Sequence, residues 1–309
     1  MAFGAFQSNA STAAQPSGAL VTQRKSPIAL LLLLPGVLYL ILFFLTPLLS
    51  LVLTSFQAPV PGGFAGDYET AFQWQNYTVV LETYWPHISR SFVYALLATV
   101  FALMIGYPIA YVIGVKLREY PLWQALALVL VIAPFFISFL LRTIAWKQIF
   151  ADEGILMSAL KGLQVIPPDA YFTGTPAAVI FGLTYNFIPF MTLPIYTSLE
   201  KLDLRYLEAG GDLYAHPATV FWKITIPLSL PGILSGTLLT FIPAAGDYIN
   251  ASRDFLGSTD TQMIGNVIEA NFLILQNFPA AAALSLLLMA AILVLVTAYV
   301  KRSGTDELL

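Results

Sequence analysis

The chain alternates between long apolar stretches and short polar ones. Six windows of about 20 residues or more contain no charged side chain: 26–66, 91–115, 120–141, 170–199, 224–246 and 270–300. A charge buried in hydrocarbon costs several kcal/mol, so each window predicts a membrane-spanning helix. The predicted helices lie near 28–53, 91–115, 122–141, 177–199, 228–246 and 280–300. We therefore predict an all-α, polytopic membrane protein with about six spans.

The remaining segments are tails and loops. Residues 1–25 are small and polar and predict a flexible tail, 26–303 a transmembrane domain, and 304–309 a short second tail. With the N-terminus inside, the inner segments carry nine Lys and Arg residues and the outer segments five. Cytoplasmic loops are enriched in these residues, so both termini are expected in the cytoplasm.

Composition narrows the function classes. The chain is 58% hydrophobic and 10% charged, too few charges for a water-facing surface of this size. It has no cysteine and two histidines, which argues against disulfides and metal sites, and its net charge of −3 argues against nucleic acid. Walker A, H-E-x-x-H and G-x-S-x-G motifs are absent. We expect no catalytic residue, metal or cofactor in this chain, and no enzyme activity.

The loop 200–227 differs from the other connections. Apolar residues recur every three or four positions up to about Leu213, which predicts a helix that Gly210-Gly211 and His216-Pro217 then break. A second short helix is predicted over 218–224. Two short helices joined to two spans would form a knob that passes a partner's movement to the membrane. The alternative is an amphipathic interfacial helix without a partner.

The same loop resembles the EAA loop of ABC-transporter permeases, roughly E-A-A-x-x-x-G followed nine residues later by I-x-L-P. The positions that match this pattern are Glu208, Ala209, Asp212, Leu213, Phe221, Ile224 and Pro227. Gly210 replaces the second alanine, Ile226 replaces the leucine, and Tyr214 stands where the family has glycine. Tyrosine resists the positive φ that glycine allows, so Gly210-Gly211 are expected to take up part of the turn.

Further matches in chain order extend the resemblance. Residues 142–146, 152–156, 227–233, 242–244, 264–268 and 299–302 are similar to the corresponding segments of spermidine/putrescine permeases. Membership of the type I importer family implies a permease subunit of a bacterial plasma-membrane importer, coupled to an ATPase through Glu208, Ala209, Gly210, Gly211, Asp212, Leu213, Tyr214 and Pro227.

The resemblance also implies partners: a second, similar permease, two ATPase subunits that bind ATP and Mg²⁺, and an extracytoplasmic substrate-binding protein. It implies a polyamine as substrate. The alternatives are another solute, such as ferric iron, thiamine or an organic anion, a stand-alone secondary transporter, and a membrane scaffold.

A translocation path needs polar groups at membrane depth. A polyamine needs carboxylates for its ammonium groups and aromatic rings for cation–π contacts. The candidates are Tyr107, Tyr185, Asn186, Asp247, Tyr248 and Asn250. The alternative for the residues at span ends is an anchor at the membrane interface.

The outer segment 54–87 is rich in aromatic and acidic residues. Its aromatic side chains either rest on the membrane surface or help to receive an external binding protein.

Overall fold

The computed structural model describes the backbone of residues 27–302. The contact pattern divides the chain into two units, between Leu49 and Ser50. The predicted tails at 1–25 and 304–309 lie outside the described residues. The first apolar run forms α1 (Pro27–Leu40), a π-helical turn (Ile41–Leu45) and α2 (Thr46–Ser55).

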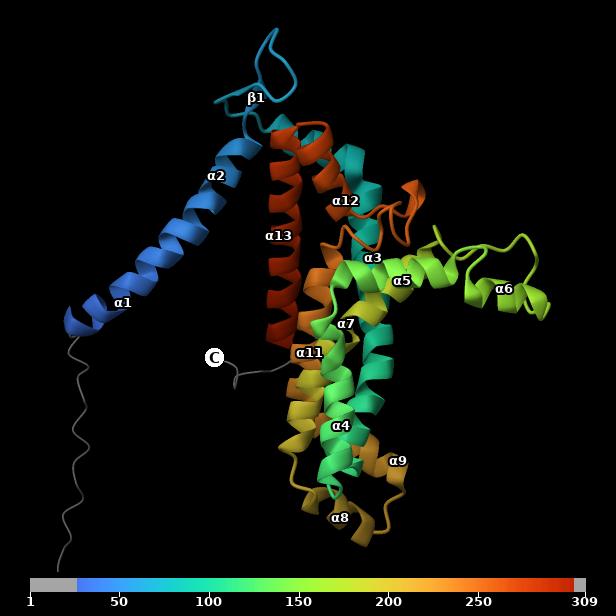
Figure 1. Cartoon of the computed structure of the whole chain (residues 1–309). Helices are drawn as coiled ribbons and strands as arrows, with labels where there is room; N and C mark the ends of the chain where they lie inside the picture. The colour runs from blue at the N-terminus through green and yellow to red at the C-terminus, as the bar shows by residue number, and fades with distance from the viewer. Residues whose placement is uncertain (1–26, 303–309) are drawn as a thin grey trace, which may run out of the picture. The chain divides into compact units, whose positions relative to one another are not determined.

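A small hairpin follows α2. Its strands are β1 (Ala58–Pro59) and β2 (Tyr68–Glu69), which pair antiparallel with Ala58 opposite Glu69. The hairpin stands at one end of the unit that begins at Ser50, beside the first residues of α3 and α13 (Figure 1).

The second predicted span is part of a much longer helix. Together α3 (Gln75–Tyr111) and a π-helical segment (Val112–Lys116) form 42 continuous helical residues. The apolar window began at residue 91, but the helix begins 16 residues earlier. A charge-free window reports contact with lipid rather than helicity, so it misses the polar first part of α3.

The span predicted over 122–141 is not one straight helix. It is divided into α4 (Pro121–Ile132), a 3-10 turn (Ala133–Phe136) and α5 (Phe139–Phe150), with a 95° bend. Ile137 has φ −107° and ψ 134°, which is extended backbone and ends the helix there. The short helix α6 (Ile155–Gly162) follows α5.

The second half of the chain agrees more closely with the predicted spans. It contains α7 (Pro176–Glu200), α8 (Arg205–Asp212), α9 (Pro217–Val220), a π-helical turn (Phe221–Thr225), α10 (Ile226–Leu228), α11 (Leu230–Ala245), a 3-10 turn (Thr259–Thr261), α12 (Ile264–Glu269), a π-helical turn (Ala270–Ile274) and α13 (Phe278–Arg302). Among the described residues four helices are long and apolar enough to cross a membrane, or six if each of two bent pairs is one span.

Helices α3, α7 and α11 form the central packing. The α11 glycines Gly232 and Gly236 lie against the α7 backbone, where an added Cβ would come within 2.7 Å of the Pro194 oxygen and 2.9 Å of the Met191 oxygen. A Cβ on Gly106 of α3 would come within 2.9 Å of the side-chain oxygen of Thr192 in α7. Small residues therefore bring the three backbones close together.

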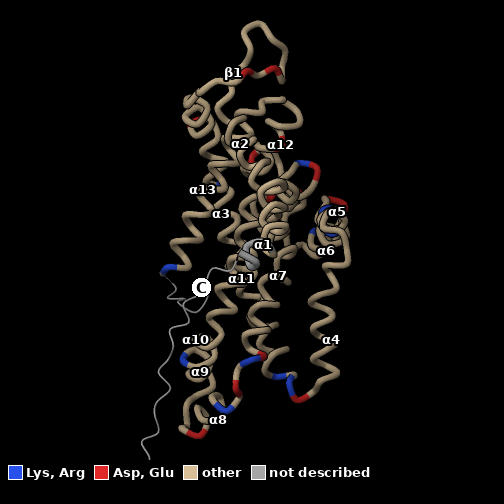
Figure 2. The backbone as a smooth tube through the Cα atoms, turned by 90° about the vertical axis from the view of Figure 1, so that its left-hand side faces the viewer, with Lys and Arg blue, Asp and Glu red and all other residues tan. Residues whose placement is uncertain are grey.

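Charged residues mark the two ends of this packing. They gather around α8 and the first turn of α4 at one end, and around the hairpin, α12, α5 and α6 toward the other, with few between (Figure 2). This distribution is the one expected of a helix bundle embedded in lipid.

Candidate functional site

Residues 200–227 form a compact feature, called here the coupling knob after the role predicted for it. It is attached to the spans by Arg118, which follows α3 and its π-helical segment. The Arg118 guanidinium donates one hydrogen bond to the Leu202 carbonyl at 2.8 Å and another to the Glu200 carbonyl. The Tyr196 hydroxyl donates to the Glu200 carboxylate at 2.7 Å. The end of α7 and the start of the coupling knob are therefore held in a fixed position.

Helix α8 carries most of the predicted coupling residues. Glu208, Ala209, Gly211, Asp212, Leu213, Tyr214 and Pro227 are all exposed. The Asp203 carboxylate accepts a hydrogen bond from the Arg205 amide at 3.0 Å near the start of α8. Because α8 is anchored and its outer face is free in this structure, that face is available to a partner.

Gly210 is the one predicted coupling residue that is buried, and it allows two helices to pack closely. A Cβ at this position would lie 2.9 Å from Val220 Cγ2 and 3.1 Å from Ile224 Cδ1. Glycine therefore lets α8 lie directly on the second helix of the coupling knob. The same contact leaves little room for the alanine that the family pattern has at this position.

The turn after α8 is made by Tyr214. Its φ is 55°, in the left-handed region that tyrosine rarely adopts, and its side chain is 99% exposed. Gly210 and Gly211 lie inside α8, and neither has a positive φ. The predictions that these glycines break the helix and share the turn are therefore wrong. His216-Pro217 does begin the next helix, and the His216 ring caps it by accepting from the Ala218 amide at 3.2 Å.

Three of the candidate path residues meet in a buried set of hydrogen bonds, called here the polar network (Thr143, Asn186, Asp247 and Asn250). The Asn186 amide donates to Thr143 Oγ1 and to Asn250 Oδ1, both at 3.2 Å. The backbone and side-chain amides of Asn250 donate to the Asp247 carboxylate at 2.7 and 3.1 Å. The polar network thereby joins α5, α7 and the loop after α11.

Space for the polar network comes from a glycine. A Cβ on Gly182 of α7 would lie 2.5 Å from Asn250 Oδ1 and 2.5 Å from Leu256 Cδ1. Next to Thr143, the Arg142 side chain is only 8% exposed and lies 5.7 Å from the centre of the Phe139 ring. Its Nε and Nη1 have no hydrogen-bond partner among the described residues. A buried cation whose donors are not all paired is costly to the fold.

The other three candidates lie apart from the polar network. The hydroxyls of Tyr107 and Ser229 share a hydrogen bond at 2.9 Å, which ties α3 to the segment that follows the coupling knob. Tyr185 packs against the Trp146 ring at 5.2 Å. Tyr248 is 48% exposed on the loop after α11. The six residues therefore do not line a single cavity in this structure, and their contact with substrate stays a prediction.

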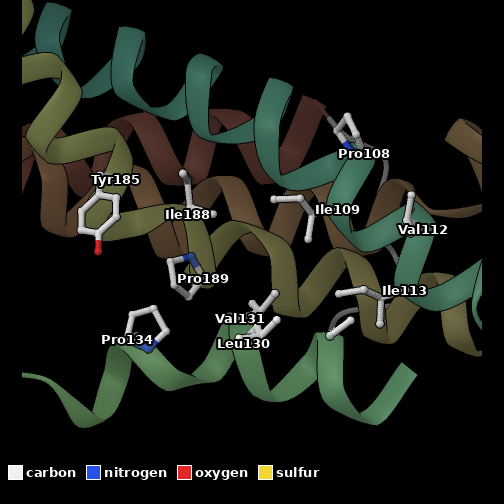
Figure 3. A pocket seen from close by; sticks show the side chains of 11 residues that line it. Pro108, Ile109, Val112, Ile113, Leu130, Val131, Pro134, Tyr185, Ile188 and Pro189 are labelled. Carbon is white, nitrogen blue, oxygen red and sulfur yellow. The ribbon is translucent and has the colours of Figure 1, made fainter. Parts of the chain in front are cut away.

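Tyr185 also borders an apolar pocket of about 560 Å³ between α3, α4 and α7. Figure 3 shows aliphatic and proline side chains from the three helices facing the same space, with Tyr185 at one side. Tyr185 provides the only hydroxyl among the side chains that line it. This pocket suits an apolar group and not an ammonium group.

A second pocket, of about 660 Å³, is polar. It is bordered by Tyr248, Arg253, Asp254 and Glu269 among others. Burial raises the pKa of Glu269, and the nearby Asp254 charge adds to this effect. Asp254 and Glu269 are the acidic residues that border this pocket, and Arg253 is the basic one. In the described part of the chain, no group of three His, Cys, Asp or Glu residues could hold a metal ion.

Sequence reasoning missed several of these residues for identifiable reasons. Arg118 entered only as a basic residue that indicates orientation, and Thr143 only as part of a matching segment. A single polar residue gives no signal of its partner when the partner lies in another helix. Gly182 gives no signal either, because a glycine in a span is common.

Comparison with known proteins decides the family. The chain is 35% identical over 266 residues to the spermidine/putrescine transport system permease protein PotB of Haemophilus influenzae, covering 84% of this chain and 89% of that protein. It is 38% identical over 251 residues to the protein of the same name from Escherichia coli K12, covering 81% and 88%. The chain belongs to this permease family. No protein-family model matches the sequence.

Solved structures agree on the fold of the permease. A bacterial ABC transporter that imports the acidic polysaccharide alginate aligns with a TM-score of 0.68 at 14% identity, covering 91% of this chain and 96% of that one. The inward-facing MetNI methionine ABC transporter aligns with a TM-score of 0.55 at 17% identity, covering 70% and 93%. The predicted family and the all-α importer-permease fold are confirmed. The relatives are transport permeases, and this permease is accordingly a membrane transport subunit.

Proposed function

We propose that this permease forms half of the translocation path of an ATP-driven importer for polyamines such as spermidine and putrescine. The observation that carries the proposal is the identity of 35–38%, over more than four fifths of the chain, to permeases named for spermidine/putrescine transport. The polar pocket bordered by Tyr248, Asp254 and Glu269 supports a cationic substrate, because its lining contains two carboxylates and an aromatic ring against one cation, Arg253.

The proposed complex contains a second, similar permease, two ATPase subunits and an extracytoplasmic binding protein. The ATPase subunits would bind ATP and Mg²⁺, since this sequence has no Walker A motif. A solved fold relative, the bacterial alginate ABC transporter, is in complex with a periplasmic protein that carries an alginate pentasaccharide. That arrangement supports a comparable external partner for this chain.

In the proposed coupling, the exposed face of α8 docks into a cytoplasmic ATPase subunit. Closure of the ATPase pair would displace the coupling knob and open the path outward, and hydrolysis would return it inward. Two features support the transfer of this movement. Arg118 fixes the coupling knob to the end of the α3 helix, and the Tyr107–Ser229 hydrogen bond connects α3 to the segment that leads into α11.

The proposed orientation puts the coupling knob and both termini in the cytoplasm of a bacterial cell. The excess of Lys and Arg in the inner segments supports it. A cysteine accessibility assay checks it. Single cysteines at Glu208 and Asp260 should react with an impermeant thiol reagent from opposite sides of the membrane.

The coupling proposal is tested by co-purification with the cognate ATPase subunit. Glu208→Ala combined with Asp212→Ala should lower the amount of bound ATPase at least several-fold, because both carboxylates lie on the exposed face of α8. Glu119→Ala is the matched control, since Glu119 is an exposed acid at the same end but outside α8. Equal ATPase recovery from the double variant and the control would contradict docking through α8.

The substrate is tested separately, with proteoliposomes that contain the assembled importer. Uptake of radiolabelled spermidine should depend on ATP and should fall when unlabelled putrescine is added. If the binding protein stimulates ATP hydrolysis but no spermidine is taken up, the proposal of an ATP-driven importer stands and the proposal of a polyamine substrate is refuted.

A further inference from the structure

The β1–β2 hairpin, residues 58–69, has a well-defined shape. Gly62 has φ 78° and Gly66 has φ 96°, and both are conformations that suit glycine. Close to these glycines, the Phe64 amide donates to the Asp67 carboxylate and the Asp67 amide donates to the Phe64 carbonyl, both at 3.0 Å. These hydrogen bonds stabilise one conformation of the tip of this short hairpin.

The hairpin is also supported from below by the start of α13. The Tyr68 hydroxyl donates to Asn277 Oδ1 at 3.4 Å, and the Tyr68 ring meets the Phe278 ring edge-on at 6.1 Å. Gly66 lies over the Gln276 side chain, where a Cβ would be 3.4 Å from Oε1. The tip therefore stands on the end of a long helix and is not a free loop.

The apolar side chain at the tip is Phe64, which is 88% exposed. Both views show this loop projecting beyond the neighbouring ends of the helices (Figures 1 and 2). Covering an exposed aromatic ring with a partner stabilises the complex. Little conformational entropy is lost on binding here, because the turn that carries the ring is already ordered.

Lipid is a poor candidate to cover Phe64. A separate aromatic cluster (Phe56, Phe72, Trp74 and Tyr77) lies directly after α2, with ring centres 4.8–5.7 Å apart. Aromatic residues at the end of a span mark the membrane interface. The Phe64 ring takes part in none of these ring contacts, so it stands apart from the aromatic residues expected at the interface.

Charge points to the same conclusion. Asp67 and Glu69 are exposed, and residues 26–89 contain no Lys or Arg. Within the described residues the one ion pair joins Lys161 and Asp152, so neither hairpin acid has a cationic partner. An acidic hairpin is repelled by anionic headgroups and attracts a protein surface that carries basic residues.

We propose that the β1–β2 hairpin is a docking element for the extracytoplasmic binding protein, with Phe64 as its apolar anchor and Glu69 and Asp67 facing a basic surface. The proposal rests on the proposed importer function and extends it, because it names the residues of this chain that receive that partner.

The test uses the complete importer in nanodiscs, with its ATPase and second permease. The cognate binding protein, loaded with spermidine, is titrated while ATP hydrolysis is measured. Phe64→Ala should raise the concentration for half-maximal stimulation about ten-fold, with unchanged basal hydrolysis. Glu69→Lys should raise it as well and should weaken its dependence on salt. The control is Ile155→Ala in α6, because Ile155 is 85% exposed but lies outside the hairpin.

Each outcome decides the proposal. Equal titration curves for wild type, Phe64→Ala and a variant with residues 60–67 replaced by an Asn-Gly turn would overturn the docking role alone. Loss of the second permease from the Phe64→Ala complex would also overturn it, in favour of a contact between permeases. If the loaded binding protein stimulates neither the wild type nor any variant, the proposed function fails and the docking role fails with it.

Discussion

The coupling knob and the polar network use their polar residues in opposite ways. In the coupling knob the carboxylates of Glu208 and Asp212 are exposed, and the fold is held by glycine packing and by hydrogen bonds to backbone carbonyls. In the polar network Asp247 is 7% exposed and Asn250 is fully buried, and they bond to each other. A polar residue in a membrane protein is therefore available to a partner in one region and is part of the internal structure in the other.

This difference predicts where substitutions change stability and where they change binding. Removing an acid from the polar network should destabilise the fold, because its donors lose their acceptor inside the protein. Removing an acid from the coupling knob should leave stability nearly unchanged and should affect only the partner.

The largest expected effect is that of Asp247→Ala. The substitution leaves the backbone and side-chain amides of Asn250 without an acceptor, which costs about 3 kcal/mol. Thermal unfolding of the purified permease in detergent should show a clearly lower Tm. Asp254→Ala is the control, because Asp254 is exposed, and its effect should stay within about 0.5 kcal/mol. Similar Tm values for the two variants would remove the contrast between the regions.

A smaller effect, with opposite signs at adjacent positions, is expected inside the coupling knob. Gly210→Ala should destabilise by about 1–2 kcal/mol, since its Cβ would meet Val220 at 2.9 Å. Gly211→Ala should stabilise by up to about 1 kcal/mol, because that site is an open helical position. The measurement is again the Tm, and Val220→Ala should recover part of the loss from Gly210→Ala. A loss of the same size from both alanines would show that α8 does not rest on Val220.

The smallest effect is expected at Tyr214. Tyr214→Gly removes left-handed strain worth roughly 1–2 kcal/mol and adds backbone entropy to the unfolded chain worth roughly 0.5–1 kcal/mol. The expected net gain is about 0.5 kcal/mol relative to Tyr214→Ala, which keeps the strain. Gln164→Gly compared with Gln164→Ala is the matched pair, because Gln164 also has φ 55°. A gain at Gln164 but none at Tyr214 would mean that the left-handed conformation at Tyr214 carries no strain for an alanine to keep.

Much of the helix layout followed from charge alone. The helix predicted over 177–199 is α7, Pro176–Glu200, and the one predicted over 228–246 is α11, Leu230–Ala245. The predictions of these two helices are correct because in each case one apolar window coincides with one helix. The break at Ile137 was missed because residues 120–141 are apolar throughout, so the break changes no charge and leaves the window intact.

The candidate site was predictable to a different degree in each region. The coupling knob is local in sequence, so its two-helix form was visible in the spacing of apolar residues. The polar network brings together Thr143, Asn186 and Asn250 from distant segments, and no single-sequence pattern records which of them meet. The left-handed Tyr214 was signalled only by a departure from a family pattern, and the structure shows that tyrosine makes the turn itself.

The length of α3 and its π-helical segment has a mechanical consequence. Forty-two residues at about 1.5 Å each give a rod of about 60 Å, roughly twice the hydrocarbon thickness. The tilt of such a lever by roughly 5° about its middle moves its tips in opposite directions by roughly 3 Å. One tip adjoins Arg118 and the other adjoins the residues that follow the hairpin. A small rotation at the end beside the coupling knob would therefore move the end beside the hairpin without any intermediate element.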